Sequence, residues 1–447
     1  MKDNLNSFAG RTRGVHSVAV RHFGVVMGWQ LRYTRRERAI EPRRDQPSNL
    51  MPDPPGQVPS HLRSPHGSAS IYLDALRGIA AVGVCLSHLR DFFFVDYAQS
   101  PHHNPLMAAA YLSTGLGHQW VVVFFVLSGY LVGGSVLRSL ALDRWSWRGY
   151  LLNRMTRLWT VLVPALILGG TLDFAGIHLF GSNGIYGGQT GAHELSIQVS
   201  SRLTATILAG NYAFLQGIYV PTFGSNGPLW SLANEFWYYV AFPFLACALW
   251  NRPSPGRRLL NAVLLIAVVA FMRPPVALMG LIWLMGVAIH YAPQVPANNI
   301  LLRRGLMIAA AMALGMAMAW CKVKPNPAAD YVLGLVVSGL IVVVLSCART
   351  PMPRAFNWTS HAISRSSYTL YLVHVPALVF LAAWIGSARW IPSLQHLLRG
   401  VGIFALVMVY AQIVWFFFEK RTDSIRARIK PLILRDNLAG ARTLTRA

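Results

Sequence analysis

The chain has 447 residues, of which 54% are hydrophobic and only 13% are charged. A soluble domain carries about 25% charged residues, so this composition excludes an ordinary soluble protein and predicts an integral membrane protein. The net charge is +24. Because the cations fall mostly in predicted loops and tails, we interpret them as membrane-orientation signals and contacts with anionic lipid, and we expect no nucleic-acid partner.

The first 68 residues differ from the rest of the chain. They are rich in arginine, are interrupted by prolines between Pro42 and Pro65, and show no sustained helical period. Low hydrophobicity with high net charge is typical of disorder. We therefore predict a basic disordered cytoplasmic tail over residues 1–68, a membrane domain over 69–420, and a second basic cytoplasmic tail over 421–447. A chain that starts near Ser68 is expected to insert and function.

Ten apolar segments are candidates to cross a bilayer as helices. They cover residues 71–92, 119–137, 151–173, 228–250, 259–272, 274–291, 304–320, 331–348, 367–386 and 398–418. A further apolar stretch, 203–220, carries polar Asn211 and Gln216, so we expect it to be re-entrant or interfacial. The predicted fold class is all-α, a polytopic membrane protein with about ten transmembrane helices.

The loop charges predict that both ends of the chain are cytoplasmic. With the N-terminus inside, the inside loops and tail hold Arg138, Arg144, Arg148, Arg154, Arg252, Arg257, Arg258, Arg303, Arg304, Arg349, Arg354, Arg365, Lys420, Arg421, Arg426, Arg428 and Lys430. The outside loops hold Arg202, Arg273, Lys322, Lys324, Arg389 and Arg399. If 203–220 were an additional span, every later loop would be inverted, against the positive-inside rule.

Two ionisable residues lie inside the first span. Arg77 and His88 are eleven residues apart, which returns a helix to within about 20° of the same face and separates them by roughly 16 Å along its axis. Ionisable groups at membrane depth are costly and by default indicate a pathway or a reaction. The alternative for each residue alone is a packed polar histidine and an arginine that extends to the headgroups.

The span 228–250 carries a second polar group. Ser231, Glu235 and Tyr238 share one helix face, and Trp230 lies beside them in sequence. A buried carboxylate needs a partner, and we expect Glu235 to orient and polarise His88, as the acid does in hydrolase triads. The alternative is a purely structural bond from Glu235 to a tyrosine or tryptophan.

Two further clusters lie near predicted helix ends. Arg154 and Arg157, three residues apart, can present a paired fork to phosphates, although they can equally be ordinary positive-inside cations. Tyr371 and His374 lie near the start of the span 367–386. His374 can meet a donor or an acceptor, and it can equally be a satisfied core histidine.

We expect no metal site. The cysteines Cys85, Cys247, Cys321 and Cys347 are isolated in apolar stretches, and the loop pair His102 and His103 lacks further ligands. The glycine-rich stretch 181–191 is predicted to be a loop and not a phosphate cradle, because no strand precedes it.

Six motifs, in this order, resemble the acyltransferase 3 family of integral membrane O-acyltransferases. They are Leu73-Asp-Ala-Leu-Arg77-Gly with His88; Val123-Phe-Phe-Val-Leu-Ser128-Gly-Tyr-Leu; Arg154-Met-Thr-Arg157-Leu; Asn211-Tyr-Ala-Phe before Pro228-Leu-Trp-Ser-Leu-Ala-Asn-Glu235-Phe-Trp-Tyr238; Ser367-Tyr-Thr-Leu-Tyr371-Leu-Val-His374; and Phe418-Glu419-Lys. One departure is Trp159-Thr-Val, where proline is common after the second arginine. The resemblance covers about residues 70–420 and implies ten spans.

The resemblance implies acyl-CoA as co-substrate, with no bound cofactor, and a hydroxyl of an extracytoplasmic carbohydrate or glycolipid as acceptor. By motif, His88 corresponds to the catalytic histidine, Arg77 to its paired arginine, and Arg154 with Arg157 to the pair that faces CoA. We expect transfer of an acyl group, most simply acetyl, at a bacterial inner membrane. His88 would be the general base and Glu235 its orienting acid. Arg77 would stabilise the thioester oxyanion or a donor phosphate.

The remaining polar residues are assigned to the acceptor or to secondary roles: Ser128, Trp230, Ser231, Tyr238, Tyr371 and His374. Ser128 and Ser231 are candidate acyl carriers, although the sequence gives neither an adjacent base. Two other functions stay open at this point. One is a transporter of glycolipid or polysaccharide, although the internal repeats typical of transporters are not evident. The other is a non-catalytic membrane partner of a glycan-assembly system, in which His88 would be dispensable.

Overall fold

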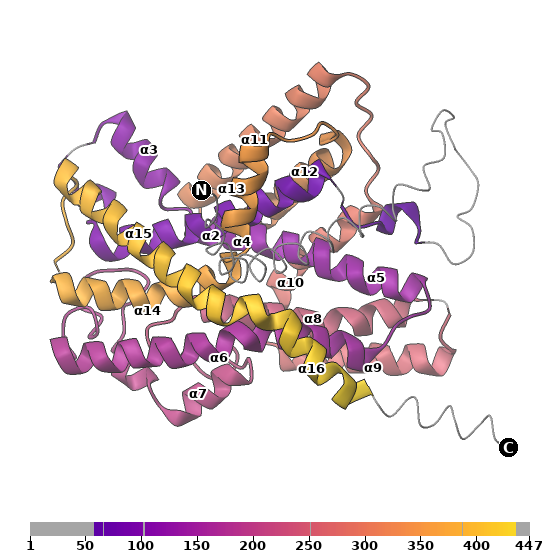
Figure 1. Ribbon diagram of the computed structural model, residues 1–447, viewed down its shortest axis with the longest axis horizontal. Helices are drawn as coiled ribbons and strands as arrows, with labels where there is room; N and C mark the ends of the chain where they lie inside the picture. The colour runs from indigo at the N-terminus through magenta and orange to yellow at the C-terminus, as the bar shows by residue number, and fades with distance from the viewer. Residues whose placement is uncertain (1–57, 66, 102, 251, 387, 435–447) are drawn as a thin grey trace, which may run out of the picture. The chain divides into compact units, whose positions relative to one another are not determined.

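Apolar helices make up most of the computed structural model, which describes residues 58–65, 67–101, 103–250, 252–386 and 388–434 (Figure 1). Within these residues the chain forms helices and two isolated β-bridges and no strand, which confirms the all-α prediction. The described residues all belong to one compact unit. The predicted disorder of residues 1–57 and the end of the C-terminal tail fall outside the described residues.

Nine helical segments among the described residues are long and apolar enough to cross a membrane. They are α2 (Ser68–Phe93), α4 (Gly117–Ser128) with its continuation to Ala141, α6 (Trp147–Phe180), α8 (Leu229–Leu249), α10 (Pro274–Ala288) with its continuation to Tyr291, α11 (Ile300–Val323), α12 (Pro327–Cys347), α14 (Ser367–Ile385) and α15 (Leu394–Phe417) with its continuation to Ile433. A tenth apolar helix, α9 (Pro255–Phe271), has 17 residues and corresponds to the predicted span 259–272. Each of the ten predicted spans is therefore a helix.

Shorter helices connect and flank these segments. They are η1 (Ser60–Leu62), η2 (Tyr97–Gln99), α3 (Pro105–Ser113), η4 (Val199–Arg202), α7 (Ala205–Tyr212), η5 (Ile289–Tyr291), α13 (Arg354–Ser364), η6 (Glu419–Arg421) and α16 (Thr422–Leu434). The stretch 203–220 forms only the eight-residue α7 and irregular chain, so it is not a further span.

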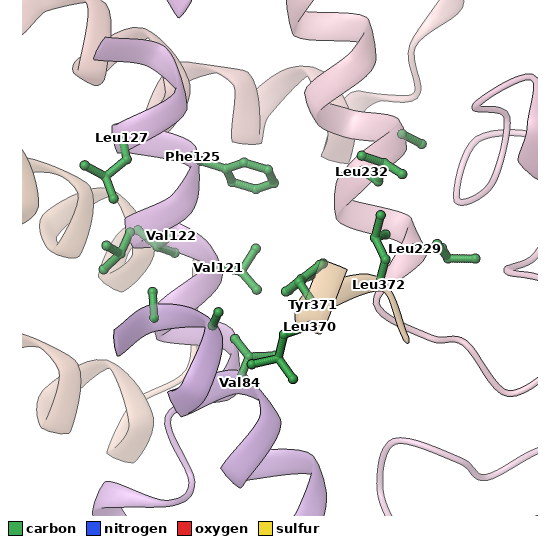
Figure 2. Close-up of a cluster of buried hydrophobic side chains, with 14 of the residues drawn as sticks. Val84, Val121, Val122, Phe125, Leu127, Leu229, Leu232, Leu370, Tyr371 and Leu372 are labelled. Carbon is green, nitrogen blue, oxygen red and sulfur yellow. The ribbon is translucent and has the colours of Figure 1, made fainter. Parts of the chain in front are cut away.

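Three helices form the centre of the helical bundle. In the apolar windows of the segment Gly117–Ala141 and of α14, 72% of the residues are buried, against 22% for α11 and for Leu394–Ile433. Helix α2 packs on both α4 and α14. Figure 2 shows side chains from these helices and from α8 directed toward one space, among them Val84, Val121, Leu229 and Leu370. The polar residues singled out on α2, α8 and α14 are thus carried by the most buried part of the fold.

A wide turn interrupts the segment that begins with α4. Residues Gly129–Gly133 form η3, a π-helix, and the α-helix resumes as α5 (Gly134–Ala141). Here the chain lies so close to α10 that a Cβ at Gly129 would collide with the Trp283 carbonyl. A Cβ at Gly286 would likewise collide with the Val126 carbonyl. Only glycine permits this approach, because any side chain would force the two helices apart.

Two predicted boundaries differ in the structure. Residues 58–65, called here the N-terminal strap, include the 3-10 turn η1 and the side chain of Leu62, which is only 2% exposed. The strap packs against α5 and η5, so part of the predicted tail belongs to the folded unit. At the other end, α16 extends to Leu434 and packs against α6, where Arg426 Nε donates to Thr156 Oγ1 at 3.2 Å. Both stretches mix charged and apolar residues, which hides their packing from a composition-based boundary.

Candidate active site

Two buried imidazoles, from α2 and α14, are directly hydrogen-bonded. His88 Nδ1 and His374 Nε2 lie 2.8 Å apart, and the two side chains belong to residues that are 6% and 0% exposed. His374 Nδ1 lies 2.9 Å from the Leu370 carbonyl oxygen. A carbonyl can only accept, so His374 carries its proton on Nδ1 and offers a lone pair at Nε2. His88 therefore donates from Nδ1, which leaves its Nε2 unprotonated in the neutral ring.

A carboxylate faces the free nitrogen of His88. Glu194 Oε2 lies 3.6 Å from His88 Nε2, and half of the glutamate side chain is exposed. When His88 is protonated, the hydrogen bond from its Nε2 and its positive charge lower the pKa of the Glu194 carboxyl below the ordinary value of 4.5, although burial acts in the opposite direction. A carboxylate here stabilises the imidazolium that forms when His88 takes a proton.

The loop that carries Glu194 is held by α2 itself. Buried Asp91, one helical turn after His88, accepts the backbone N–H groups of His193 and Glu194 at 3.2 and 3.0 Å. The loop begins with the glycine-rich stretch, which the structure confirms to be irregular. Because it buries Ile185, Tyr186 and Leu195, it is a packed element and not a loose connection.

The free nitrogen of His88 opens into a small cavity. This histidine cavity has a volume of about 70 Å³. It is lined by Val84, His88, Gly117, His118, Val121, Glu194, Pro228, Trp230 and Tyr371. The predicted acceptor residues Trp230 and Tyr371 thus lie in the same cavity as His88. His118 is hydrogen-bonded to Asp330 at 2.9 Å.

A second, larger cavity lies on the other side of Val121 and Tyr371. It has a volume of about 390 Å³, and four arginines line it: Arg77, Arg138, Arg154 and Arg157. Glu235 is the acidic residue in the wall of this arginine cavity. Arg77 and Arg154 each have a buried Nε without a hydrogen-bond partner. Buried unpaired donors and an excess of positive charge fit a bound polyanion.

Val121 and Tyr371 line both cavities, so they form the divide between them. Figure 2 shows both side chains at the meeting point of α4 and α14. Tyr371 is held by a 2.6 Å hydrogen bond between its hydroxyl and that of Ser231, and Ser231 also donates to the Pro228 carbonyl at 3.1 Å. The two predicted residues Ser231 and Tyr371 are therefore partners at this divide.

Neighbouring side chains fix the positions of the arginines. Arg77 Nη2 donates to Asp74 Oδ1 at 2.7 Å. The Arg154 guanidinium lies over the rings of Tyr150 and Tyr239, at 5.8 and 5.9 Å from the two ring centres. These contacts favour a defined cationic wall over freely extending surface arginines.

The expected pairing of Glu235 with His88 is wrong. Glu235 Oε1 accepts from Ser128 Oγ at 2.5 Å and from the Tyr239 hydroxyl. Trp283 Nε1 donates to Ser128 Oγ at 3.1 Å. The nitrogens of His88 are directed instead to His374 and Glu194. The depth of Glu235 along α8 suggested a contact with His88. The packing of α8 instead directs its carboxylate into the arginine cavity.

Two other predicted residues also differ from expectation. Ser128 has a carboxylate neighbour in Glu235, which the sequence did not reveal. Tyr238 donates from its hydroxyl to the Val276 carbonyl at 2.6 Å, so it ties α8 to α10 and lines neither of the two cavities described above.

Comparison with known proteins agrees with these cavities. The model of the acyltransferase domain of acyltransferase 3 proteins matches residues 70–419. The chain belongs to the acyltransferase 3 family. No curated protein and no solved structure matches it. The matched residues include every residue that lines the two cavities, whereas the N-terminal strap precedes them.

Membership of the acyltransferase 3 family makes this chain an acyltransferase, and its long apolar helices make it an integral membrane one. Sequence reasoning did not assign Glu194, Asp91, His118 or Arg138 to the site. Glu194 lies in a loop without a helical pattern, Asp91 lies near the end of the predicted span 71–92, and His118 lies just before the predicted span 119–137. Arg138 had the right position but was counted only as an orientation signal.

Proposed function

We propose that this protein transfers an acyl group, most simply acetyl, from cytoplasmic acyl-CoA to a hydroxyl of a carbohydrate on the opposite side of the membrane. The observation that carries the proposal is the pair of adjacent cavities, one walled by arginines and one containing the free nitrogen of His88. A donor rich in phosphate suits the first, and a neutral polyhydroxyl acceptor suits the second.

In the proposed reaction His88 Nε2 takes the proton of the acceptor hydroxyl while the hydroxyl oxygen attacks the thioester carbonyl. The tetrahedral intermediate then collapses, breaking the carbon–sulfur bond and forming the ester. The thiolate of CoA leaves and takes up a proton, for which the His88 imidazolium is the nearest source. His374 keeps the ring oriented throughout, and the Glu194 carboxylate balances the imidazolium charge.

Arg77 is better suited to the donor than to the reacting carbonyl. It lies eleven residues from His88 on α2, a separation of roughly 16 Å along the helix axis. Its side chain lines the arginine cavity together with Arg154 and Arg157. We therefore assign these three guanidinium groups to the phosphates and pantetheine of acyl-CoA.

The test uses membranes that contain the full chain, radiolabelled acetyl-CoA and extracted cell-envelope glycans. We expect labelled ester in the glycan fraction, which mild alkali releases as acetate. Labelled glycan must be absent with His88→Ala at equal protein abundance. If the unlabelled glycan crosses the membrane without esterification, a transporter is the better description. If His88→Ala cells make normal esterified glycan, the protein is a non-catalytic partner.

A further inference from the structure

The N-terminal strap is a fixed part of the fold although it precedes the residues that the family model matches. Leu62 is among the largest fully buried side chains of the described chain, and Val58 packs against the same core. Burial of apolar side chains such as Leu62 is favourable and holds a short segment in place. The strap therefore has a defined position relative to α5 and η5.

Backbone carbonyls of the strap contact polar side chains of the bundle. Leu62 O accepts from Arg138 Nη1 at 2.9 Å. His61 O lies 3.3 Å from Nδ1 of His290, whose Nε2 lies 2.8 Å from the Tyr130 carbonyl oxygen. The His290 ring also stacks on Tyr130, at 4.6 Å between ring centres. These contacts connect the strap to the helical segment that forms one wall of the arginine cavity.

Arg138 marks one end of that wall. The wall is formed by α4, η3 and α5, from Val121 between the two cavities to Arg138 on α5. These two residues are 17 positions apart in the chain. At about 1.5 Å per residue they are separated by roughly 25 Å along the helix. The cavity thus extends from the histidine cavity to a guanidinium group far from the reacting atoms.

We propose that Arg138 binds the phosphate of acyl-CoA that lies farthest from the thioester, the 3′-phosphate of the nucleotide, and that the N-terminal strap orients Arg138 for this contact. The inference rests on the proposed donor. CoA is a long molecule with its thioester at one end and this phosphate at the other, as the cavity requires. The Leu62 carbonyl accepts one hydrogen bond from the Arg138 guanidinium, and the remaining N–H groups of this side chain can donate to a phosphate.

The test compares acetyl-CoA with 3′-dephospho-acetyl-CoA as donors for the full chain in phosphatidylcholine vesicles. The wild type should have a KM for acetyl-CoA about tenfold lower than for the dephospho donor, as expected for one charge-assisted contact. Arg138→Gln should raise the KM for acetyl-CoA by about the same factor and leave the KM for the dephospho donor unchanged. Leu62→Asp, which unseats the strap, should reduce the preference for acetyl-CoA in the same direction.

The matched control is Arg144→Gln, which removes an exposed arginine near the end of the same helical segment without touching the cavity. It should leave both KM values unchanged. A purely structural Arg138 would make Arg138→Gln affect both donors equally, and that result would overturn the proposal. A wild type that does not distinguish the two donors, or a Leu62→Asp variant that keeps the full preference for acetyl-CoA, would overturn it as well. Failure of the wild type to transfer from either donor would instead refute the proposed function, and this inference with it.

Discussion

The position of one proton decides whether His88 can act as a base. Because His374 Nδ1–H donates to the Leu370 carbonyl, His374 Nε2 can only accept the hydrogen bond from His88 Nδ1. We predict that His374→Phe lowers the turnover number by about 10²-fold, within the range of general-base effects, without lowering protein abundance. The double variant with His88→Ala should be little worse than His88→Ala alone, since both rings serve one step. Turnover by His374→Phe above half of the wild-type value would rule out the orienting role.

Glu194 provides a test that depends on pH. Its pKa is lowered below 4.5, so between about pH 5 and about pH 8 the carboxylate is ionised in the folded protein. Glu194→Gln should lower turnover throughout this range by a nearly constant factor, because the imidazolium loses its countercharge at every pH tested. The measurement is the pH profile of the turnover number for both proteins. A penalty that vanishes toward pH 5 would mean that Glu194 is already protonated there, against the direction of its pKa shift.

The arginine pair Arg154 and Arg157 should act on the donor. Changing both to Gln should raise the KM for acetyl-CoA by more than about tenfold and leave the KM for the acceptor nearly unchanged, because phosphate contacts are lost. The control is the double change of Arg257 and Arg304 to Gln, which removes two exposed cations from the same predicted side of the membrane. Equal effects from both pairs would reduce Arg154 and Arg157 to orientation signals.

At the scale of the elements, truncations should locate the start of the folded unit between residues 57 and 68. A chain that begins at Val58 retains Leu62 and its carbonyl contact with Arg138, whereas a chain that begins at Ser68 loses both. We predict that the first variant keeps acyl transfer, and that the second unfolds at lower temperature and loses affinity for acetyl-CoA. Thermal unfolding in detergent and the donor KM measure these effects. Full activity of the chain that begins at Ser68 would contradict this prediction and would place the start of the functional unit at residue 68, as the sequence predicted.

Hydropathy predicted the long helices well because a membrane span must be both apolar and about 20 residues long. The ten predicted segments are all helical for this reason. The same criterion could not find α13, which is short and amphipathic, or the strap, whose packing depends on one leucine. It also could not show that α16 prolongs the last helix, because charged residues there lower the mean hydropathy.

The site was predicted within helices and missed between them. Helical spacing put Arg77 and His88 on one face, and both line cavities, because this relation depends only on the geometry of one helix. The partner of His88 is a residue 286 positions away, and no local pattern encodes which helices become neighbours. Glu235 was therefore given the wrong partner, although hydrogen bonds to its carboxylate were expected.

For the molecule as a whole, the proposed function places the donor in the arginine cavity and the acceptor in the histidine cavity, so the two substrates would meet from different sides of Val121 and Tyr371. We predict that sealed vesicles transfer acetyl groups only when acetyl-CoA is on the side of the arginine cavity and the glycan is on the other. Vesicles of both orientations, with the donor enclosed or added outside, provide the measurement. If transfer occurred only when acetyl-CoA and the glycan were on the same side of the membrane, the acyl group would not pass from one cavity to the other, and this prediction would be wrong.

The π-helix η3 lies between Ser128 and Arg138, and its winding sets the direction in which Arg138 points relative to Ser128 around the helix axis. Its wide turn accommodates one residue more than an α-helical turn, between Ser128 and Arg138. Because the wide turn absorbs this extra residue, its deletion would restore a regular helix and leave Arg138 close to its present azimuth relative to Ser128. Winding the unchanged sequence as a regular α-helix would instead turn Arg138 by up to about 100°. The direction in which the distant guanidinium points is thus set by local backbone winding, so a change that converts η3 into regular α-helix would uncouple donor affinity from the chemistry without altering any side chain that lines the cavity.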